Sequence, residues 1–448
     1  MINKNIFIQT IGCQMNVYDS DQMFRLLRPM GYKKTSSIKE ADLILVNTCA
    51  IREKAEQKVF SFLGRLLKYK NKNPHLIIAV GGCVAQQEGN KIRQRAPFVD
   101  LVFGTHAFCK LPEMIASLES AKNDDFGITD IDFVENIDDL EFESSFFPIT
   151  GISDFVTIMR GCDNYCSYCV VPYVRGREMS RKPEIILQEI KEKVDRGIRE
   201  IILLGQNVNS YGKKEGLCSF SQLLYKINEI KGLKRIRFTT SHPKDLSKEL
   251  IIAFGEIDKL CNHIHLPVQS GSDKILKKMN RKYTRKDYSD KLNSLRKVCP
   301  DIAITSDFIV GFPGENEEDF QETLSLIKEI EYDSLFAFQY SDRPVAISSK
   351  FLPKVDEEIK NKRLNQLLEF QASISENKSK KFLGTIQKVL VEGISKKGEQ
   401  QWTGRASNNR IVNFTSPEPV NNLRGQELDV EIIGVCAHSL KGISQETS

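Results

Sequence analysis

The sequence has no apolar run that approaches the ~18 residues of a membrane-spanning helix. The stretch MINKNIFIQTIGCQ at its start also lacks the apolar core and cleavage site of a signal peptide. Neither sign of charge dominates, since 64 Lys and Arg stand against 59 Asp and Glu, and a net charge of +5 permits a polyanionic partner without demanding one. We therefore expect a cytoplasmic protein. Disulfides are rare in that compartment, so the eleven cysteines are core thiols, metal ligands or catalysts.

Three apolar runs of strand length in the first segment each end in a cysteine. They are NIFIQTIGC, ending at Cys13, DLILVNTC, ending at Cys49, and HLIIAVGGC, ending at Cys83. Helix-like stretches follow the first two, so the pattern predicts a parallel α/β sheet domain over residues 1–120. Ligands of such sheets lie beyond the carboxyl ends of the strands, where the three thiols converge. We interpret them as a metal site, and three buried core thiols are the alternative.

The remaining chain divides into an acidic linker and two further domains. Nine acids and one lysine lie between Lys122 and Phe147, which predicts a solvated linker over residues 121–147. Residues 148–376 alternate six strand-like runs with amphipathic helices, too few for a closed eight-stranded barrel, so we expect a partial (β/α)6 barrel. Residues 377–445 are β-rich and predict a small OB-like β-barrel. There, Arg405 and Arg410 bracket ASNN and are candidates for binding a phosphate backbone, with solvated surface charge as the alternative.

Three cysteines within eight residues follow the first strand of the central segment, in CDNYCSYC: Cys162, Cys166 and Cys169. A zinc ribbon needs a second CxxC pair to complete four ligands, and none follows. A redox CxxC leaves Cys162 unexplained. A cubic iron–sulfur cluster bound by three thiolates leaves its fourth iron free to bind a small molecule, and we favour this interpretation.

The CxxxCxxC spacing resembles that of radical S-adenosylmethionine (SAM) enzymes, in which the free iron chelates SAM and reduction yields a 5′-deoxyadenosyl radical. Nearly the whole chain resembles the radical SAM methylthiotransferase family. TIGCQMNVYDSDQM, NTCAIREKAEQKVF and GGCVAQQEG resemble its N-terminal domain, and MRGCDNYCSYCVVPYVRGREMSR resembles its radical domain. TGRASNNRIVNF resembles its C-terminal TRAM domain, a small RNA-binding barrel. Within the family, GCQMNVYDS and CAIREKA resemble the MiaB type.

This resemblance implies an enzyme that places a methylthio group on C2 of N6-isopentenyladenosine at position 37 of tRNA, with SAM as both methyl donor and radical source. It implies two [4Fe-4S] clusters. One, on Cys13, Cys49 and Cys83, holds the sulfur to be inserted, and the other, on Cys162, Cys166 and Cys169, binds SAM. The implied partners are tRNA, an electron donor such as a flavodoxin or ferredoxin, and iron–sulfur assembly proteins.

Other functions remain open from the sequence. Related branches of the family act on threonylcarbamoyl-adenosine in tRNA or on an aspartate of a ribosomal protein. A non-enzymatic iron–sulfur carrier or RNA-binding protein is a further alternative, although a carrier needs neither a SAM pocket nor an RNA module.

The resemblance also suggests residues around SAM. Tyr168 looks like the aromatic residue that contacts the adenine of SAM. Gly205, Gln206 and Asn207 stand where the superfamily often has a Gly-Gly-Glu segment contacting the SAM amine. Gln269, Ser270 and Asp307, at later strand ends, are further candidates, and VGFPGE (310–315) resembles a glycine turn that faces SAM. Turn and capping roles are the alternative for each of these residues.

A few other residues complete the set of candidates. Arg175 and Arg177 lie beside the cysteine loop, as surface ion pairs or as contacts to SAM or RNA. Val345 and Ala346 replace the last two residues of the family's usual Arg-x-Gly-Thr, which is the one clear departure from its pattern. His242 and His265 lack partners at ligand spacing, so we expect no metal there. We interpret the scattered cysteines as structural thiols: Cys109, Cys218, Cys261, Cys299 and Cys436.

Overall fold

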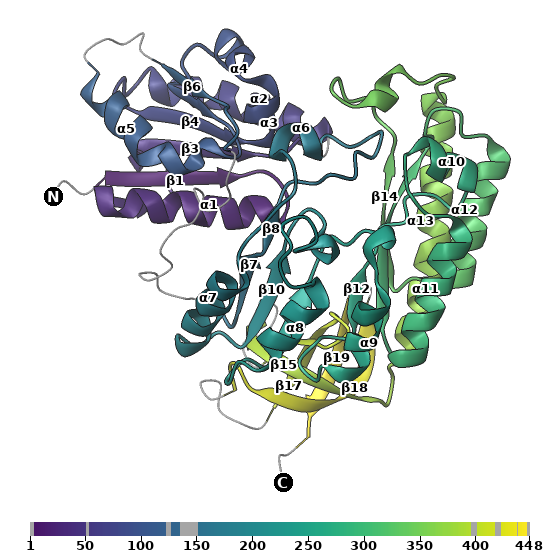
Figure 1. The fold of residues 1–448 in the computed structure, drawn as a ribbon. Coiled ribbons are helices and arrows are strands. Elements are labelled where there is room, and N and C mark those ends of the chain that lie inside the picture. Colours follow the sequence, from purple (N-terminus) through teal and green to yellow (C-terminus); the bar gives the residue numbers. More distant parts are fainter. Residues whose placement is uncertain are drawn as a thin grey trace. The chain divides into compact units, whose positions relative to one another are not determined.

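The computed structural model describes residues 4–50, 53–121, 127–134, 151–395, 401–416, 423–436 and 438–445 (Figure 1). The chain forms two compact units. The first comprises Met1–Glu143, Arg160–Tyr165 and Cys169–Met179, and the second comprises Ser144–Met159, Cys166–Tyr168 and Ser180–Ser448. The cysteine loop therefore contributes to both units.

A parallel sheet of six strands, in the order β2-β1-β3-β4-β5-β6, forms the core of the first unit. Its strands are β1 (Lys4–Thr10), β2 (Tyr32–Lys34), β3 (Leu43–Thr48), β4 (Ile77–Gly82), β5 (Leu101–Phe103) and β6 (Ile128–Asp130). Its helices are α1 (Gln14–Leu27), α2 (Glu53–Lys70), α3 (Cys83–Glu88), α4 (Asn90–Arg95), α5 (Leu111–Ser120) and α6 (Val171–Arg175).

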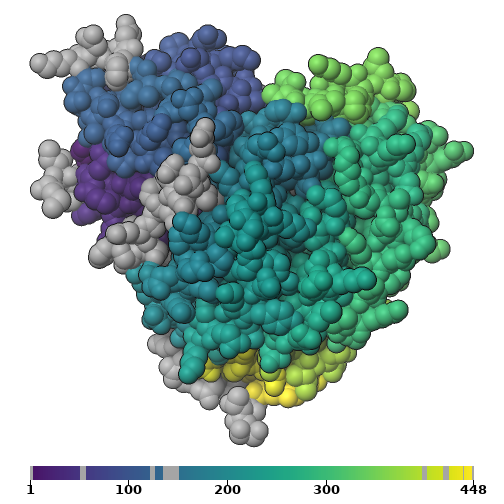
Figure 2. Space-filling view, in the orientation of Figure 1, coloured from purple at the N-terminus to yellow at the C-terminus, as the bar shows by residue number. Residues whose placement is uncertain are grey.

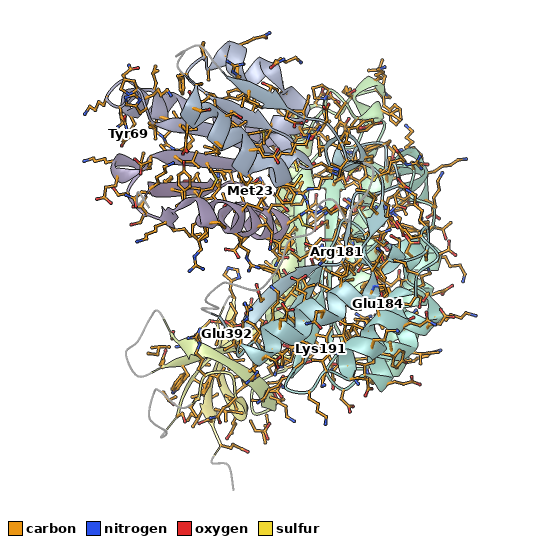
Figure 3. The ribbon with its side chains drawn as sticks, turned by 60° about the vertical axis from the view of Figure 1, so that its left-hand side comes forward. Met23, Tyr69, Arg181, Glu184, Lys191 and Glu392 are labelled. Atoms are coloured by element: carbon orange, nitrogen blue, oxygen red, sulfur yellow. The ribbon has the colours of Figure 1, made fainter. Side chains whose placement is uncertain are left out.

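Both faces of this sheet are covered, which explains its continuous apolar strands. Alternate residues of β3 point to opposite faces: Leu45 packs with Met23 of α1, and Val46 packs with Leu63 of α2. Met23 is labelled on α1 in Figure 3. The predicted parallel α/β sheet is confirmed. Strand β6 lies inside the segment expected to be a linker, while residues 122–126 and 135–147 of that segment lie outside the described residues.

Six parallel strands form the partial barrel of the second unit, as two three-stranded sheets, β11-β10-β7 and β12-β13-β14. A parallel bridge between Ile236 and Leu260 joins the two sheets. The strands are β7 (Ser153–Thr157), β10 (Glu200–Leu204), β11 (Arg235–Phe238), β12 (His263–His265), β13 (Ala303–Val310) and β14 (Ser334–Gln339). Each corresponds to one of the six runs expected from the sequence, so the partial barrel is confirmed. A two-stranded sheet of β8 (Met159–Arg160) and β9 (Met179–Ser180) flanks the cysteine loop.

Helices follow the barrel strands and cover their outer side, as α11–α13 do beside β14 in Figure 1. They are α7 (Pro183–Asp195), α8 (Phe220–Asn228), α9 (Lys248–Glu256), α10 (Asp273–Lys278), α11 (Arg285–Val298), α12 (Glu317–Ile330) and α13 (Glu357–Lys380). Side-chain N-caps such as Ser272 and Thr284 fix where several of them begin. None of the helices in the described part of the chain is long and apolar enough to cross a membrane.

The C-terminal residues form a closed barrel in the order β15-β16-β17-β19-β18. Its strands are β15 (Ile386–Ile394), β16 (Trp402–Ala406), β17 (Ile411–Thr415), β18 (Glu427–Cys436) and β19 (Ser439–Ser444). Trp402, Val412 and Phe414 are buried in its core. The predicted small β-barrel is confirmed.

Two buried arginines of β11 attach this barrel to the six-stranded domain, and Figure 2 shows yellow residues of the barrel directly against teal residues of that domain. Arg235 Nη2 donates to the Lys388 carbonyl oxygen at 2.9 Å, and Arg237 Nη2 donates to the Ala406 carbonyl oxygen at 2.7 Å. Arg235 is the first residue of β11, so the barrel is docked at the amino-terminal ends of the parallel strands. The cysteine loop follows the carboxyl end of β7, after the short strand β8.

Candidate functional site

The ends of three neighbouring strands bring Cys13, Cys49 and Cys83 to one edge of the first sheet. Thr10 of β1 pairs with Asn47 of β3, and Thr48 of β3 pairs with Gly82 of β4, so the three strands end level with one another. Cys49 and Cys83 directly follow their strands and are buried, whereas Cys13 follows a short turn and is exposed. The convergence expected from the sequence thus arises from the register of the sheet.

A hydrogen-bond network around Asn16 fixes the turn that carries Cys13. Asn16 Oδ1 accepts hydrogen bonds from the Cys13 backbone N–H at 3.2 Å and from its thiol at 3.3 Å. Asn16 Nδ2 donates to Asn47 Oδ1 at 3.1 Å and to the Thr48 carbonyl oxygen at 3.0 Å. Gly12 permits this close approach, because a Cβ there would lie 2.8 Å from the Cβ of Cys49.

The thiols of this first trio differ in acidity. A hydrogen bond from Cys49, together with the charge of Arg175, lowers the pKa of Cys13 to about 6; although the side chain is exposed, partial desolvation by the surrounding protein atoms opposes both effects. Cys13 also occupies the N-cap of α1, where the helix dipole favours an anion. Burial raises the pKa of Cys83, and the charge of Arg175 partly offsets that rise. Cys13 is therefore more ready than Cys83 to act as a thiolate ligand.

A buried ion-pair network of three residues lies next to these thiols. Asp19 of α1 accepts from Arg175 Nη2 at 2.8 Å and from Arg160 Nη2 at 3.1 Å. All three side chains are almost fully buried. The Nη1 atoms of both arginines are buried without an oxygen or nitrogen partner among the described residues. Arg175 is thus a buried ion-pair partner of Asp19, and the surface pair considered from the sequence applies only to Arg177, which is exposed and pairs with Asp163.

The first trio fits an iron–sulfur cluster. No group of three His, Cys, Asp or Glu side chains among the described residues is arranged to hold a single metal ion. In a cubic cluster each thiolate binds a different iron, so the thiols need not surround one ion. The free Nη1 donor of Arg175, beside the thiols, suits an anionic cluster with sulfide acceptors.

In the second trio, each thiol accepts a hydrogen bond from an N–H group of another residue. Cys162 Sγ accepts from Asn164 Nδ2 at 3.4 Å, Cys169 Sγ from the Val171 backbone N–H at 3.4 Å, and Cys166 Sγ from Arg281 Nη1 at 3.5 Å. N–H donors of this kind tune the electronic properties of a cluster that is bound through the sulfur atoms. This donor set also fits an iron–sulfur cluster.

Gly161 makes the turn before the second trio possible. Its φ is +74°, and a Cβ at this position would lie 2.0 Å from the carbonyl oxygen of Arg177. A residue with a side chain therefore cannot occupy this position without moving the backbone.

Tyr168, expected to contact SAM, packs beside a small apolar cluster in the second unit formed by Ile275, Met279, Phe312 and Tyr340. Its hydroxyl oxygen lies 3.5 Å from Arg281 Nη1, the same nitrogen that donates to Cys166. Arg281 is buried and donates from Nε to Tyr283 Oη at 2.7 Å. One guanidinium thus holds both the central cysteine and the tyrosine of the loop.

The segment Gly205, Gln206 and Asn207 follows the end of β10, as expected. A Cβ on Gly205 would lie 2.5 Å from Met159 Cγ, so glycine is required for packing. Asn207 is buried and its Nδ2 donates to Asp245 Oδ2 at 2.8 Å. Its Oδ1 is buried without a partner among the described residues and is therefore an acceptor available to a bound amine.

Gln269, Ser270 and Asp307 occupy different environments. Gln269 is buried with φ at +79°, a strained conformation for a residue with a side chain and one that clusters at functional sites. Ser270 Oγ accepts from the Ser272 backbone N–H at 3.2 Å, which is a turn contact before α10. Asp307 Oδ2 lies 3.5 Å from His265 Nε2 on the neighbouring strand. These contacts leave Gln269 and Asp307 as the stronger candidates.

The loop at residues 310–315 is fixed by an ion pair between its Glu315 and Arg363 of α13. Glu315 Oε1 accepts from the Gly311 backbone N–H at 2.9 Å and from Arg363 Nη1 at 2.9 Å. In the later loop that departs from the family pattern, Ala346 is buried and its N–H donates to the Arg343 carbonyl oxygen at 2.9 Å, while Val345 is partly exposed. The substitution therefore places a methyl side chain in a packed turn.

His242 is a structural residue of the second unit. Its Nδ1 accepts from the Lys244 backbone N–H at 3.2 Å, and burial lowers its pKa, so the ring is neutral. Its ring packs edge-on against Tyr283 with centroids 5.6 Å apart.

The two arginines of the C-terminal barrel both have partners within the protein. Arg405 Nε donates to Glu392 Oε1 at 3.1 Å, and Glu392 is labelled on this barrel in Figure 3. Arg410 Nη1 donates to Ser379 Oγ at 2.9 Å, and its guanidinium lies over the Phe382 ring. Arg405 thus pairs within its own barrel, whereas Arg410 reaches the end of α13.

Sequence reasoning missed Asn16, Asp19 and Arg281. Asn16 and Asp19 look like exposed helix positions, although Asn16 lies one turn beyond Cys13 on the same helical face. Arg281 stands in KKMNRKYTRK, a basic run that reads as solvated surface. A signal for Asn16 was thus present in the helical spacing, but none marked Arg281 as buried.

Three family profiles match successive parts of the chain. The description "Uncharacterized protein family UPF0004" matches residues 5–104, the radical SAM superfamily matches residues 156–327, and the TRAM domain matches residues 380–443. These matches cover the sheet domain, most of the partial barrel and the C-terminal barrel.

Curated relatives match almost the full length of the chain. The tRNA-2-methylthio-N(6)-dimethylallyladenosine synthase of Desulfosudis oleivorans is 52% identical over 453 residues, covering 98% of this chain and 97% of that protein. The synthase of the same name from Geobacter sulfurreducens is 48% identical over 445 residues, with 98% and 97% covered.

Solved structures share the fold at low sequence identity. The radical S-adenosylmethionine methyltransferase TsrM from Kitasatospora setae aligns with a TM-score of 0.58 at 12% identity, covering 78% of this chain and 77% of that chain. The cobalamin-dependent radical enzyme OxsB aligns with a TM-score of 0.51 at 13% identity, covering 83% and 56%. These likenesses bear on the fold alone.

Proposed function

Because the chain belongs to the family of tRNA-2-methylthio-N(6)-dimethylallyladenosine synthases, we propose that it methylthiolates C2 of N6-isopentenyladenosine at position 37 of tRNA. The observation that carries the proposal is 52% identity across 98% of the chain. The radical SAM and UPF0004 domains imply an iron–sulfur cluster and SAM as cofactors. The TRAM domain and the family imply a tRNA substrate.

We assign one [4Fe-4S] cluster to each cysteine trio. Cys13, Cys49 and Cys83 hold the first cluster, and Cys162, Cys166 and Cys169 hold the second, which binds SAM. When bound, these groups supply the sulfur to be inserted, its methyl group and the 5′-deoxyadenosyl radical, chemistry that an unactivated C2–H requires. Two SAM molecules are used in each turnover, one for the methyl group and one for the radical.

The chain's own residues bind and orient these groups. Asn16 fixes the Cys13 turn through hydrogen bonds of 3.2 and 3.3 Å, so that the thiol points to the edge shared by the three strands. Asn207 offers a buried, unpaired Oδ1 to the amine of SAM, beside Gly205 and Gln206. Tyr168, Gln269 and Asp307 are assigned to the same SAM site, with Ser270 shaping the turn after Gln269.

The C-terminal barrel is proposed to bind the tRNA backbone. Arg405 is the stronger candidate of the two arginines, because its ion-pair partner Glu392 lies on the surface of the same barrel. Arg410 is assigned a smaller share of RNA binding, since its contacts dock the barrel. The enzyme works in the cytoplasm with an electron donor such as a flavodoxin or ferredoxin and with iron–sulfur assembly proteins.

A competition between substrates tests this function. Anaerobically reconstituted full-length protein is supplied with two anticodon stem-loops of one sequence, one carrying isopentenyladenosine and one carrying adenosine. Burial of the apolar isopentenyl group is worth a few kcal/mol at ~0.8 kcal/mol per CH₂, so the modified loop should be preferred by far more than tenfold. The base at this position is unpaired in the loop, so the enzyme can contact the edges of the base directly. Mass spectrometry of the nucleosides measures the products.

Other substrates serve as controls in the same experiment. A stem-loop carrying threonylcarbamoyl-adenosine and a ribosomal peptide bearing the target aspartate represent the other family branches. Equal turnover of the isopentenyladenosine and adenosine loops contradicts the proposed specificity, and modification of the peptide alone moves the chain to the ribosomal branch. Release of 5′-deoxyadenosine from SAM separates an enzyme from an iron–sulfur carrier.

A further inference from the structure

Arg281 is a buried cation that contacts Cys166 and Tyr168 of the cysteine loop. Its four hydrogen bonds to residues that the structure describes end on tyrosine hydroxyls, a backbone carbonyl and a thiol. Nε donates to Tyr283 Oη at 2.7 Å, Nη2 to the Pro267 carbonyl oxygen at 2.5 Å, and Nη1 to Tyr168 Oη and Cys166 Sγ, both at 3.5 Å. Arg281 as a whole is only 7% exposed.

No carboxylate within the described ranges lies within ion-pair distance of this guanidinium. Five other buried arginines each pair with an acid: Arg160 and Arg175 with Asp19, Arg235 with Glu427, Arg237 with Glu200, and Arg363 with Glu315. A buried charge without a counter-charge is strongly unfavourable. Arg281 therefore requires a negatively charged partner other than a carboxylate side chain.

The titratable neighbours of Arg281 do not supply that charge. Burial raises the pKa of Tyr283 to about 12, so its phenol is neutral at physiological pH. His242 packs against Tyr283, and burial holds the pKa of His242 low, so this ring adds no charge either. Among the groups that are hydrogen-bonded to Arg281, Cys166 is the one assigned as a cluster ligand, and a cysteine binds iron as a thiolate.

We propose that Arg281 is the counter-charge of the cluster bound by Cys162, Cys166 and Cys169, with the Cys166 thiolate as its direct ion-pair partner. This inference rests on the assignment of that cluster under the proposed function. Three thiolates outweigh the positive charge of an oxidised cubic core, and reduction adds a further negative charge. A fixed cation one hydrogen bond away favours binding of the cluster and favours its reduced form even more.

The guanidinium also has a positioning role that a simple ammonium cannot fully replace. Its planar fork holds Cys166 and Tyr168 through one nitrogen while Tyr283 and the Pro267 carbonyl anchor the other two. Arg281 therefore aligns a cluster ligand with the aromatic residue assigned to the adenine of SAM. It is a positioning residue, because it acts on the cluster and SAM through Cys166 and Tyr168.

The test uses the full chain with Cys13, Cys49 and Cys83 replaced by Ala, so that only the second cluster is observed. Arg281→Met and Arg281→Lys are made in this parent. Arg237→Met is the matched control, because Arg237 is another buried arginine of the same unit and pairs with Glu200 at the opposite ends of the strands. Bound iron, the reduction midpoint of the cluster and the unfolding of both cluster-free and loaded protein are measured.

Arg281→Met should weaken cluster retention at least tenfold and shift the reduced-to-oxidised ratio about tenfold toward oxidised, which is 59 mV for one electron. Arg281→Lys should restore most of that ratio, because it keeps the charge. In the cluster-free chain Arg281→Met should unfold no more easily than the parent, since it removes an uncompensated charge. Arg237→Met should destabilise cluster-free and loaded protein alike and leave the midpoint unchanged.

An unchanged midpoint and unchanged retention in Arg281→Met overturn the inference, and so does a Lys variant that behaves like Met in both respects. If Arg281→Met fails to fold, the reduction midpoint of Arg281→Lys decides the question. A reduced-to-oxidised ratio within threefold of that of the parent supports the charge role, and a larger change in this ratio contradicts it. If the parent itself binds no iron, or Cys166→Ala retains it, then the cluster assignment of the proposed function fails instead.

Discussion

Asp19 joins two arginines next to the first cysteine trio, and this places a buried net positive charge beside thiols that must ionise to bind iron. Arg175 and Arg160 each contribute one cation, while Asp19 contributes one anion. The remaining positive charge is suited to offset the negative charge of the cluster that we propose for these three cysteines. Asp19 thus stabilises the cluster-free protein and also holds the two arginines beside the first cysteine trio.

Asp19→Asn is expected to be strongly destabilising, because it leaves two buried guanidinium groups without their shared carboxylate. Breaking a buried pair costs about 3–5 kcal/mol, which denaturant unfolding of the cluster-free chain measures. Asp21→Asn is the matched control on the same helix, since Asp21 is 45% exposed and pairs with Arg25 and Lys34 at the surface. That change should stay within about 0.5 kcal/mol. Equal losses for both variants contradict the assigned role.

Cys13 should be alkylated as a thiolate at unusually low pH in the cluster-free chain. A hydrogen bond from Cys49 lowers the pKa of Cys13 to about 6, so its rate of reaction with iodoacetamide should rise with a midpoint near pH 6. Cys49→Ala removes that donor and should move the midpoint upward. Mass spectrometry of the Cys13 peptide across a pH series gives both midpoints, and an unshifted midpoint in Cys49→Ala excludes the hydrogen bond as the cause.

The six candidate ligands could be proposed from sequence because cysteines at strand ends and in CxxxCxxC leave a local pattern. The partners of these cysteines leave no such pattern. Asp19 meets Arg175 across 156 residues, and Arg281 meets Cys166 across 115. Contacts at such separations depend on the register of strands and on how loops pack, which composition and spacing do not encode.

Elements, in contrast, were largely predictable. The six strands of the partial barrel follow from apolar runs separated by amphipathic helices, and the sheet of the first unit follows from strands that are apolar on both faces. Short pieces were less visible: β6 is only three residues long and lies in an acidic stretch, where charge outweighs the strand signal. The docking of the C-terminal barrel was also not predictable, because the buried arginines of RIRF resemble exposed positions of an alternating strand.

The C-terminal barrel gives a prediction at the scale of an element. A chain ending at Leu383 should bind tRNA weakly. Arg235 is changed to Gln in this chain because its partner Glu427 is removed with the barrel, whereas Arg237 is kept because it pairs with the buried Glu200. The shortened chain should keep its iron and its cleavage of SAM, because the barrel docks at the strand ends opposite to the cysteine loop. Filter binding, iron analysis and deoxyadenosine release measure the three properties. Loss of iron in the shortened chain contradicts this division of roles.

Arg405 and Arg410 separate RNA contact from docking within the same barrel. Arg405→Ala should reduce the slope of log K against log salt by about 0.7–0.9, the contribution of one phosphate contact. Arg410→Ala should lower the melting temperature with a smaller change in slope, because its guanidinium binds Ser379 and covers Phe382. Binding of an anticodon stem-loop at several salt concentrations gives the slopes. If only Arg410→Ala reduces the slope by the amount expected for one phosphate contact, then Arg410 rather than Arg405 contacts the RNA.

At the scale of the whole molecule, the two cysteine trios should be separable in one chain. Replacing Cys162, Cys166 and Cys169 with Ala should halve the bound iron and abolish SAM cleavage. Replacing Cys13, Cys49 and Cys83 should also halve the iron, yet it should spare uncoupled formation of 5′-deoxyadenosine, because the radical depends on the second cluster alone. Neither variant should methylthiolate tRNA, since sulfur and radical are both required.

Three scattered cysteines provide the matched control for this experiment. Cys109, Cys218 and Cys436 are free thiols outside both trios, and their joint replacement with Ala should leave iron content and turnover unchanged. If the variant of the first trio keeps its full iron, the thiols that converge at the ends of β1, β3 and β4 do not bind a cluster. They would then be core thiols beside a buried salt bridge, and the inserted sulfur would have to come from another site.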